Sequence, residues 1–187
     1  MAIKIAVTGD LGSGKSTVCK ELKKRLNAHY FSTGEIQRKI ASEKGMSTYD
    51  LNRYAEDHPE IDRLIDDELK ALSSSTDDMI IDSRMAWHFV NNAFKVFLLV
   101  DETVAAKRII DDKRGLTETY LSIADAKQKL SARKESENFR YKQVYGVDCY
   151  DLTNYDLVID TTDISPATVA ERIIEQYTEW EKMTIRE

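Results

Sequence analysis

The chain has 187 residues, of which 42% are hydrophobic and 32% are charged, and its formal net charge is −6 at pH 7. This length suits one soluble domain with a hydrophobic core. The excess of acidic residues argues against general binding to nucleic acid or to a membrane surface, because both favour lysine and arginine. The longest apolar run, residues 96–100, is far too short to span a membrane.

The first element expected along the chain is a strand. Residues 3–8 alternate and are rich in β-branched side chains. Because the N-terminus leads directly into this strand, we expect no signal peptide. Cys19 and Cys149 form no metal-ligand pair, and such sparse cysteine usage fits a reducing compartment. We therefore expect a cytoplasmic protein.

The stretch after this strand follows the pattern G-x-x-x-x-G-K-[ST] of a phosphate-binding P-loop. Its members are Gly9, Asp10, Leu11, Gly12, Ser13, Gly14, Lys15, Ser16 and Thr17. Val18, Leu22 and Leu26 then recur at helical spacing. The motif therefore lies between a strand and a helix, which disfavours the alternative of a glycine-rich turn without a ligand.

The chemistry of this motif explains its residue types. Glycines allow the backbone to turn its N–H groups toward a polyphosphate, and the dipole of the following helix favours the same anion. Lys15 is expected to contact the β- and γ-phosphates of ATP, and the Ser16 hydroxyl is expected to bind Mg²⁺.

Strands and helices alternate along the rest of the chain. The further expected strands are residues 29–32, 79–82, 94–100 and 155–160. The expected helices are residues 33–44, 48–57, 59–72, 85–90, 102–112, 122–143 and 166–181, with a break at 113–115 and Ser165 as an N-cap. This order predicts an α/β fold with a five-stranded, all-parallel sheet and helices on both faces. Ligands bind beyond the carboxyl ends of the strands in such sheets.

Polar residues follow the second and third expected strands. Thr33 would begin a helix that presents Arg38 one turn later, which suits the phosphate of a second substrate. Taken alone, an N-capping threonine and a solvated arginine explain this pair more simply. Asp82 ends a buried strand, where P-loop proteins hold a carboxylate near Mg²⁺, although a turn-forming aspartate is the alternative. Arg84 would face the same crevice.

The expected helix 122–143 carries Arg133, Glu137 and Arg140 on one face. Residues 127–142 contain six lysines and arginines against two glutamates. Such a basic segment in an acidic protein suggests a guanidinium clamp on a phosphoryl group in transfer. A solvated helix with a surface pair between Arg133 and Glu137 is an equally good explanation at this point.

Together these motifs resemble the nucleoside monophosphate kinases, and most closely the short cytidylate kinases of the archaeal type. The segment Ser32-Thr33-Gly34-x-x-x-Arg38 is similar to the one that holds the monophosphate in these enzymes. Asp82-Ser83-Arg84 resembles their acid-Gly-Arg, with serine in place of glycine.

The same resemblance extends to the basic helix and the last strand. Arg133-x-x-x-Glu137-x-x-Arg140 is similar to the cytidylate kinase pattern Arg-Asp-x-x-Asp-Ser-x-Arg, from which it departs at Lys134, Glu137 and Asn138. Residues 140–146 and 155–160 also look like the archaeal-type enzymes.

The resemblance implies the reaction ATP + CMP (or dCMP) ⇌ ADP + CDP (or dCDP) with Mg²⁺ as cofactor, in a monomer. It implies one P-loop kinase domain, with a core of residues 1–33, 77–112 and 155–187, monophosphate-binding helices 34–76 and a lid 113–143. The implied catalytic residues are Lys15, Arg84, Arg133 and Arg140. The implied monophosphate-binding residues are Ser32, Thr33, Gly34, Arg38, Arg84 and Glu137. Ser16 would bind Mg²⁺ directly, and Asp82 would bind it through water.

Two other functions stay open on the sequence alone. One is a kinase of another small acceptor, such as a different monophosphate or shikimate. The other is a degenerate kinase that binds ATP as a sensor. The segment from Ser32 to Arg38 favours a phosphorylated acceptor, while the departures at Ser83, Lys134 and Glu137 are what would support a degenerate enzyme.

Overall fold

The structure is a computed structural model that describes residues 2–111 and 120–184. Five parallel strands form one sheet in the order β2-β3-β1-β4-β5. The strands are β1 (Lys4–Gly9), β2 (His29–Ser32), β3 (Met79–Asp82), β4 (Phe94–Leu99) and β5 (Leu157–Asp160). The prediction of a five-stranded, all-parallel sheet is confirmed.

Helices connect these strands in the alternating order expected from the sequence. The α-helices are α1 (Lys15–Leu26), α2 (Thr33–Glu43), α3 (Thr48–Asp57), α4 (Glu60–Ser74), α5 (Ala86–Phe89), α6 (Glu102–Asp111), α7 (Ile123–Tyr145) and α8 (Pro166–Thr184). A short 3-10 helix, η1 (Leu152–Asn154), precedes β5 and was not expected. It delays the start of β5 from the expected residue 155 to Leu157.

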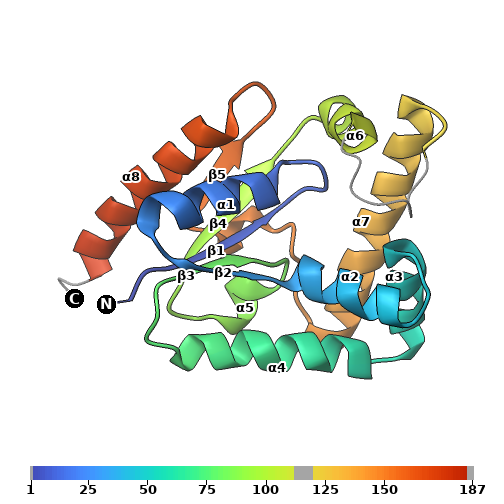
Figure 1. Ribbon diagram of the computed structural model, residues 1–187, viewed down its shortest axis with the longest axis horizontal. Coiled ribbons are helices and arrows are strands. Elements are labelled where there is room, and N and C mark those ends of the chain that lie inside the picture. The colour runs from blue at the N-terminus through green and yellow to red at the C-terminus, as the bar shows by residue number, and fades with distance from the viewer. Residues whose placement is uncertain (1, 112–119, 185–187) are drawn as a thin grey trace.

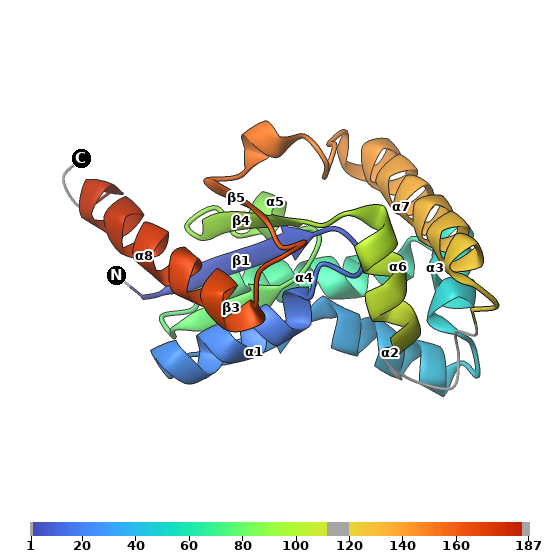
Figure 2. The same ribbon diagram turned by 90° about the horizontal axis from the view of Figure 1, so that it is seen from above.

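Helices cover both faces of the sheet, which gives three layers (Figures 1 and 2). On one face α1 and α8 supply Leu22 and Ile173 to a core cluster that includes Val7 of the central strand. On the other face α4 and α5 cover the sheet, and Leu69 of α4 joins a cluster with Ile81 of β3. Because both faces of the strands are buried, β3 and β4 consist of nearly continuous apolar runs.

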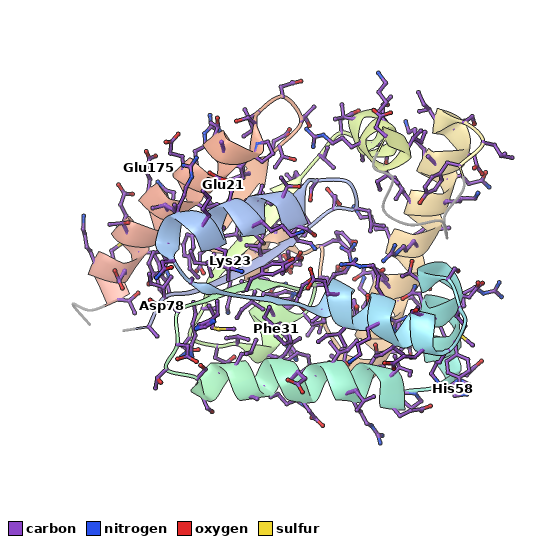
Figure 3. The ribbon with its side chains drawn as sticks, viewed as in Figure 1. Glu21, Lys23, Phe31, His58, Asp78 and Glu175 are labelled. Carbon is purple, nitrogen blue, oxygen red and sulfur yellow. The ribbon has the colours of Figure 1, made fainter. Side chains whose placement is uncertain are left out.

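The remaining helices, α2, α3, α6 and α7, gather beyond the carboxyl ends of the strands, on the right of Figure 1. The Ser32 side chain accepts a hydrogen bond from the Glu35 backbone N–H at 3.3 Å. Ser32 therefore caps α2, and the alternative in which Thr33 is the cap is wrong. Figure 3 labels Phe31 of β2, which packs against the core cluster between α4 and the sheet, and His58, the C-cap of α3.

The other bounds agree with the sequence-based prediction to within a few residues. Ser165 caps α8, since its hydroxyl accepts from the Thr168 backbone N–H at 3.1 Å, and this helix continues to Thr184. The break expected at residues 113–115, together with the first part of the expected lid, lies outside the described residues. Within the described ranges, no helix is long and apolar enough to cross a membrane.

Candidate active site

The P-loop has the backbone geometry that its sequence pattern requires. Gly12 and Gly14 have positive φ angles of 80° and 81°, a region that disfavours side chains. A Cβ at Gly12 would also lie 2.8 Å from the Cα of Ala105 in α6. The N-terminus of α1 carries no side-chain cap. Its first N–H groups are therefore directed into the loop, where an anion binds favourably.

Asp82, at the end of β3, organises the side chains next to this loop. Its carboxylate forms an ion pair with the Lys15 ammonium and accepts a hydrogen bond from the Ser16 hydroxyl at 2.8 Å. The Tyr30 hydroxyl donates to the same carboxylate at 3.0 Å. Burial alone would raise the pKa of Asp82, but the positive charge of Lys15 and these hydrogen bonds lower it. The carboxylate is therefore ionised at neutral pH.

The oxygens of Ser16 and Asp82 form a donor set that fits Mg²⁺. Hydroxyl and carboxylate oxygens are the hard ligands that this ion prefers, and Mg²⁺ bound with a nucleotide takes its other ligands from phosphate and water. No group of three His, Cys, Asp or Glu side chains suited to a metal occurs among the residues that the structure describes. A few protein oxygens are what a nucleotide-bound ion requires.

A second charged cluster joins α7 to the end of β3. Glu137 is 3% exposed, and its carboxylate lies between two guanidiniums. Arg133 Nε donates to Glu137 Oε1 at 2.8 Å, and Arg84 Nε contacts Oε2. Burial alone would raise the pKa of Glu137, but the charges of Arg84 and Arg133 lower it to about 2. The alternative of a solvated surface pair is wrong, because this carboxylate is buried.

Arg84 is fixed from two further directions. Its Nη1 donates to the Gly9 carbonyl at 2.9 Å and to the Tyr150 hydroxyl at 3.3 Å. Burial alone would lower the pKa of Arg84, but the negative charge of Glu137 raises it, so the guanidinium stays charged. The end of the P-loop strand β1, the loop after β3 and helix α7 thus share one network.

The segment expected to hold a monophosphate lies in the same cavity. This cavity has a volume of about 450 Å³ and extends from the P-loop to α4. Ser32, Thr33, Gly34 and Arg38 contribute to its wall. Arg38 folds back over the first turn of α2, since a Cβ at Gly34 would lie 3.4 Å from its Nη1. A helix N-terminus and a guanidinium are both groups that favour an anion nearby.

Arg140 takes a different direction from Arg133. Its Nη1 donates to the backbone and side-chain oxygens of Asn52 at 3.0 and 2.9 Å, and its Nε lies 3.0 Å from Asp62. It does not line the large cavity that Arg133 and Arg84 share. In this geometry Arg140 ties α7 to α3 and α4.

Two basic residues at the site make contacts that could not be predicted from the sequence. Arg108 of α6 donates to the Thr161 and Thr162 carbonyls at 2.8 and 3.0 Å and lies 3.4 Å from the Gly12 carbonyl. Lys134 of α7 pairs with Asp10 of the P-loop at 2.9 Å. One signal was available in the sequence, because Asp62 and Asp66 occupy the apolar face of α4, where carboxylates are rare without a partner.

The sequence of the chain is also similar to that of a known protein family. The chain matches the model of the cytidylate kinase-like family over residues 4–163. The chain belongs to this family.

Curated members named cytidylate kinase are similar over nearly their whole length. The enzyme of Methanothrix thermoacetophila is 38% identical over 157 residues, which cover 84% of this chain and 87% of the relative. The enzyme of Thermoplasma volcanium is 34% identical, covering 98% of this chain and 95% of the relative. An S-adenosylmethionine-dependent nucleotide dehydratase of Lacinutrix mariniflava is 36% identical over 95% of this chain, but the chain spans only 36% of that protein.

Solved structures agree on the fold. A shikimate kinase of Acinetobacter baumannii has a TM-score of 0.58 at 16% identity, covering 96% of this chain and 94% of the other. A gluconokinase of Sinorhizobium meliloti has a TM-score of 0.58 at 14% identity, covering 98% of this chain and 97% of the other. At this identity the likeness shows the P-loop kinase fold that the cytidylate kinase-like family shares with them.

The buried, ionised state of Glu137 predicts how the stability of the folded protein depends on pH. The pKa of Glu137 is about 2 in the folded protein against an ordinary 4.5, so its contribution to stability is full above pH 4.5 and is lost as the pH falls toward 2. Glu137→Gln should reduce the free energy of unfolding by about 3–5 kcal/mol at pH 7, because the two partly buried guanidiniums of Arg84 and Arg133 lose their charged partner. The difference from wild type should shrink as the medium becomes acidic.

Urea denaturation at a series of pH values measures this difference. Glu135→Gln is the control, because Glu135 is exposed on the same helix. A deficit for Glu137→Gln that stays constant from neutral to acid pH would show that the charge of Glu137 is not the source of its stability.

Proposed function

We propose that the protein is a cytidylate kinase, which transfers the γ-phosphate of ATP to CMP or dCMP. The observation that carries this proposal is one continuous cavity that joins a P-loop to a second, arginine-lined anion site. A P-loop ATPase without an acceptor would not require the second site. The family match and the curated cytidylate kinases support a nucleoside monophosphate as the acceptor.

The nucleophile in this reaction is an oxygen of the monophosphate itself. The second pKa of a phosphate monoester is about 6, so this group is already ionised at neutral pH and requires no general base. The protein must therefore position two anions against each other and neutralise their repulsion. The charged groups that face the cavity suit this task.

On the donor side, the P-loop N–H groups and Lys15 would hold the β- and γ-phosphates. Ser16 would bind Mg²⁺ and Asp82 would hold it through water, and the bound ion would supply positive charge that neutralises the phosphates. Lys15 pairs with Asp82 in the structure, so it must exchange this carboxylate for phosphate oxygen when ATP binds.

On the acceptor side, the start of α2 and Arg38 would hold the monophosphate. Arg84 and Arg133 lie across the same cavity, both fixed by Glu137. These two guanidiniums would contact the transferred phosphoryl group between donor and acceptor. Helix α7, linked to the P-loop by Lys134 and Asp10, would act as the lid that excludes water.

Arg140, the other arginine of this face of α7, would have a different role. Arg140 would act as a positioning residue, because it reaches a phosphate only by leaving Asn52 and Asp62. Residues 34–76 would hold the monophosphate, and the remaining core would hold ATP. We expect the enzyme to work as a monomer in the cytoplasm.

A coupled assay of ADP release tests the reaction and its acceptor. The acceptors to compare are CMP, dCMP, UMP, AMP, GMP and shikimate. We expect CMP and dCMP to react fastest, because the acceptor site would admit a pyrimidine more easily than the larger purines. Lys15→Met should lower kcat about 10²-fold or more, since it removes a charge that faces the γ-phosphate.

Lys20→Met is the matched control, because Lys20 is exposed on the same helix. It should keep the wild-type rate, and both variants should keep the wild-type melting temperature. Equal rates on AMP and CMP would contradict the assigned acceptor. A near-normal rate for folded Lys15→Met would contradict the role of the P-loop in catalysis.

The two arginines of α7 should respond differently to replacement by alanine. Arg133→Ala should lower kcat more than it raises KM, because its contact with the phosphoryl group strengthens in the transition state. Arg140→Ala should instead lower the melting temperature, because it leaves the Asp62 carboxylate buried without its partner. Steady-state kinetics and thermal unfolding of both variants measure the contrast. A stable Arg140→Ala enzyme with a collapsed kcat would show that Arg140 contacts substrate.

A further inference from the structure

The lining of the cavity includes the arginines and extends to the side chains of α4. Its wall there is largely apolar and contains two carboxylates from α4. These residues are Asp62, Ile65, Asp66, Leu69, Met85 and Tyr141. Figure 1 shows α4 running beneath the sheet, with α2 and α7 at its N-terminal end. An apolar wall with few polar groups suits the base of a nucleotide, because such pockets bind flat rings and orient them with few hydrogen bonds.

The two carboxylates at this end differ in their partners. Asp62 lies 3.0 Å from the Arg140 guanidinium, which neutralises it. Asp66 is 6% exposed, and no lysine or arginine nitrogen of the described residues lies within ion-pairing distance of it. Asp66 is therefore a buried carboxylate without a cationic partner, which is an unfavourable state unless other donors satisfy it.

One of the two oxygens of the Asp66 carboxylate accepts a hydrogen bond from the protein. The Tyr145 hydroxyl donates to Asp66 Oδ2 at 2.6 Å. The Tyr145 ring packs edge-on against Phe89 with centroids 5.4 Å apart, which holds the hydroxyl in place. Among the described residues, no donor reaches Asp66 Oδ1. One oxygen is fixed by the protein, and the other is available to a ligand in the cavity.

We propose that Asp66, oriented by Tyr145, accepts a hydrogen bond from the 4-amino group of the acceptor base and so selects cytosine over uracil. This inference rests on the proposed function. Cytosine carries an N–H donor at position 4, and aspartate is a natural acceptor for it. Uracil carries a carbonyl oxygen at the same position, which a carboxylate repels. The contact therefore both attracts the correct base and rejects the wrong one.

Burial supports this assignment. It raises the pKa of Asp66, while the hydrogen bond from Tyr145 acts in the opposite direction. A carboxylate in a largely buried position gains more from a donated N–H than a fully solvated one does, because the lower local dielectric strengthens the hydrogen bond. Asp66 would thus be a specificity residue that contacts the base, and Tyr145 would be its positioning residue.

Replacement of the carboxylate by the matched amide tests the contact. Asp66→Asn keeps the shape but can present an N–H to the uracil carbonyl. The ratio of kcat/KM for CMP to that for UMP should fall about 10-fold or more. Tyr145→Phe should lower the same ratio less, because the carboxylate remains but loses its orientation. Asp67→Asn is the control, since Asp67 is the next residue of α4 and its side chain is 77% exposed, and it should keep the wild-type ratio.

A change in the substrate tests the contact without any change in the protein. The monophosphate of 2-pyrimidinone riboside lacks the 4-amino group but keeps the rest of CMP. Wild-type enzyme should use it with a kcat/KM about 10-fold or more below that of CMP. Equal use of the two acceptors would overturn the inference, whether or not the variants fold.

The outcomes also separate this inference from the proposed function. An active wild-type enzyme whose CMP-to-UMP ratio survives in folded Asp66→Asn would overturn the contact alone. A wild-type protein that phosphorylates none of these monophosphates would overturn the proposed function and the contact together.

Discussion

The buried carboxylate of Glu137 is the group on which the arrangement of the site depends. It brings the guanidiniums of Arg84 and Arg133 to one place, although these residues come from the loop after β3 and from helix α7. A carboxylate so deeply buried is tolerable only because two cations surround it. The same contact links α7 to the loop after β3, so α7 and the Arg133 that it carries are positioned together with Arg84.

Asp82 has the corresponding role next to the P-loop. It holds Lys15, Ser16 and Tyr30 around one carboxylate at the end of β3. Two acidic residues thus keep cations in fixed positions along one cavity of a protein whose net charge is −6. The guanidiniums that Glu137 fixes before the substrates arrive would require little reorganisation during phosphoryl transfer, and such preorganised charges lower the barrier.

The sequence was a good guide to the elements and a poor guide to contacts between distant ones. The P-loop could be recognised because its residues follow one another closely in the sequence. The strands could be recognised because each is a short, continuous apolar run. By contrast, a shared helix face suggested that Arg133 and Arg140 act together, yet seven residues of helix rise about 10 Å, and Arg140 binds Asn52 and Asp62 instead. Helical periodicity also does not show what covers a face, so the burial of Glu137 could not be predicted.

In the proposed reaction the γ-phosphate of ATP passes directly to CMP. A single-turnover experiment with enzyme in excess over ATP labelled at the γ-phosphate follows this transfer. We expect the label to appear in CDP when CMP is present, with little free phosphate, because α7 would exclude water from the closed site. Label released as inorganic phosphate at the same rate with or without CMP would contradict direct transfer.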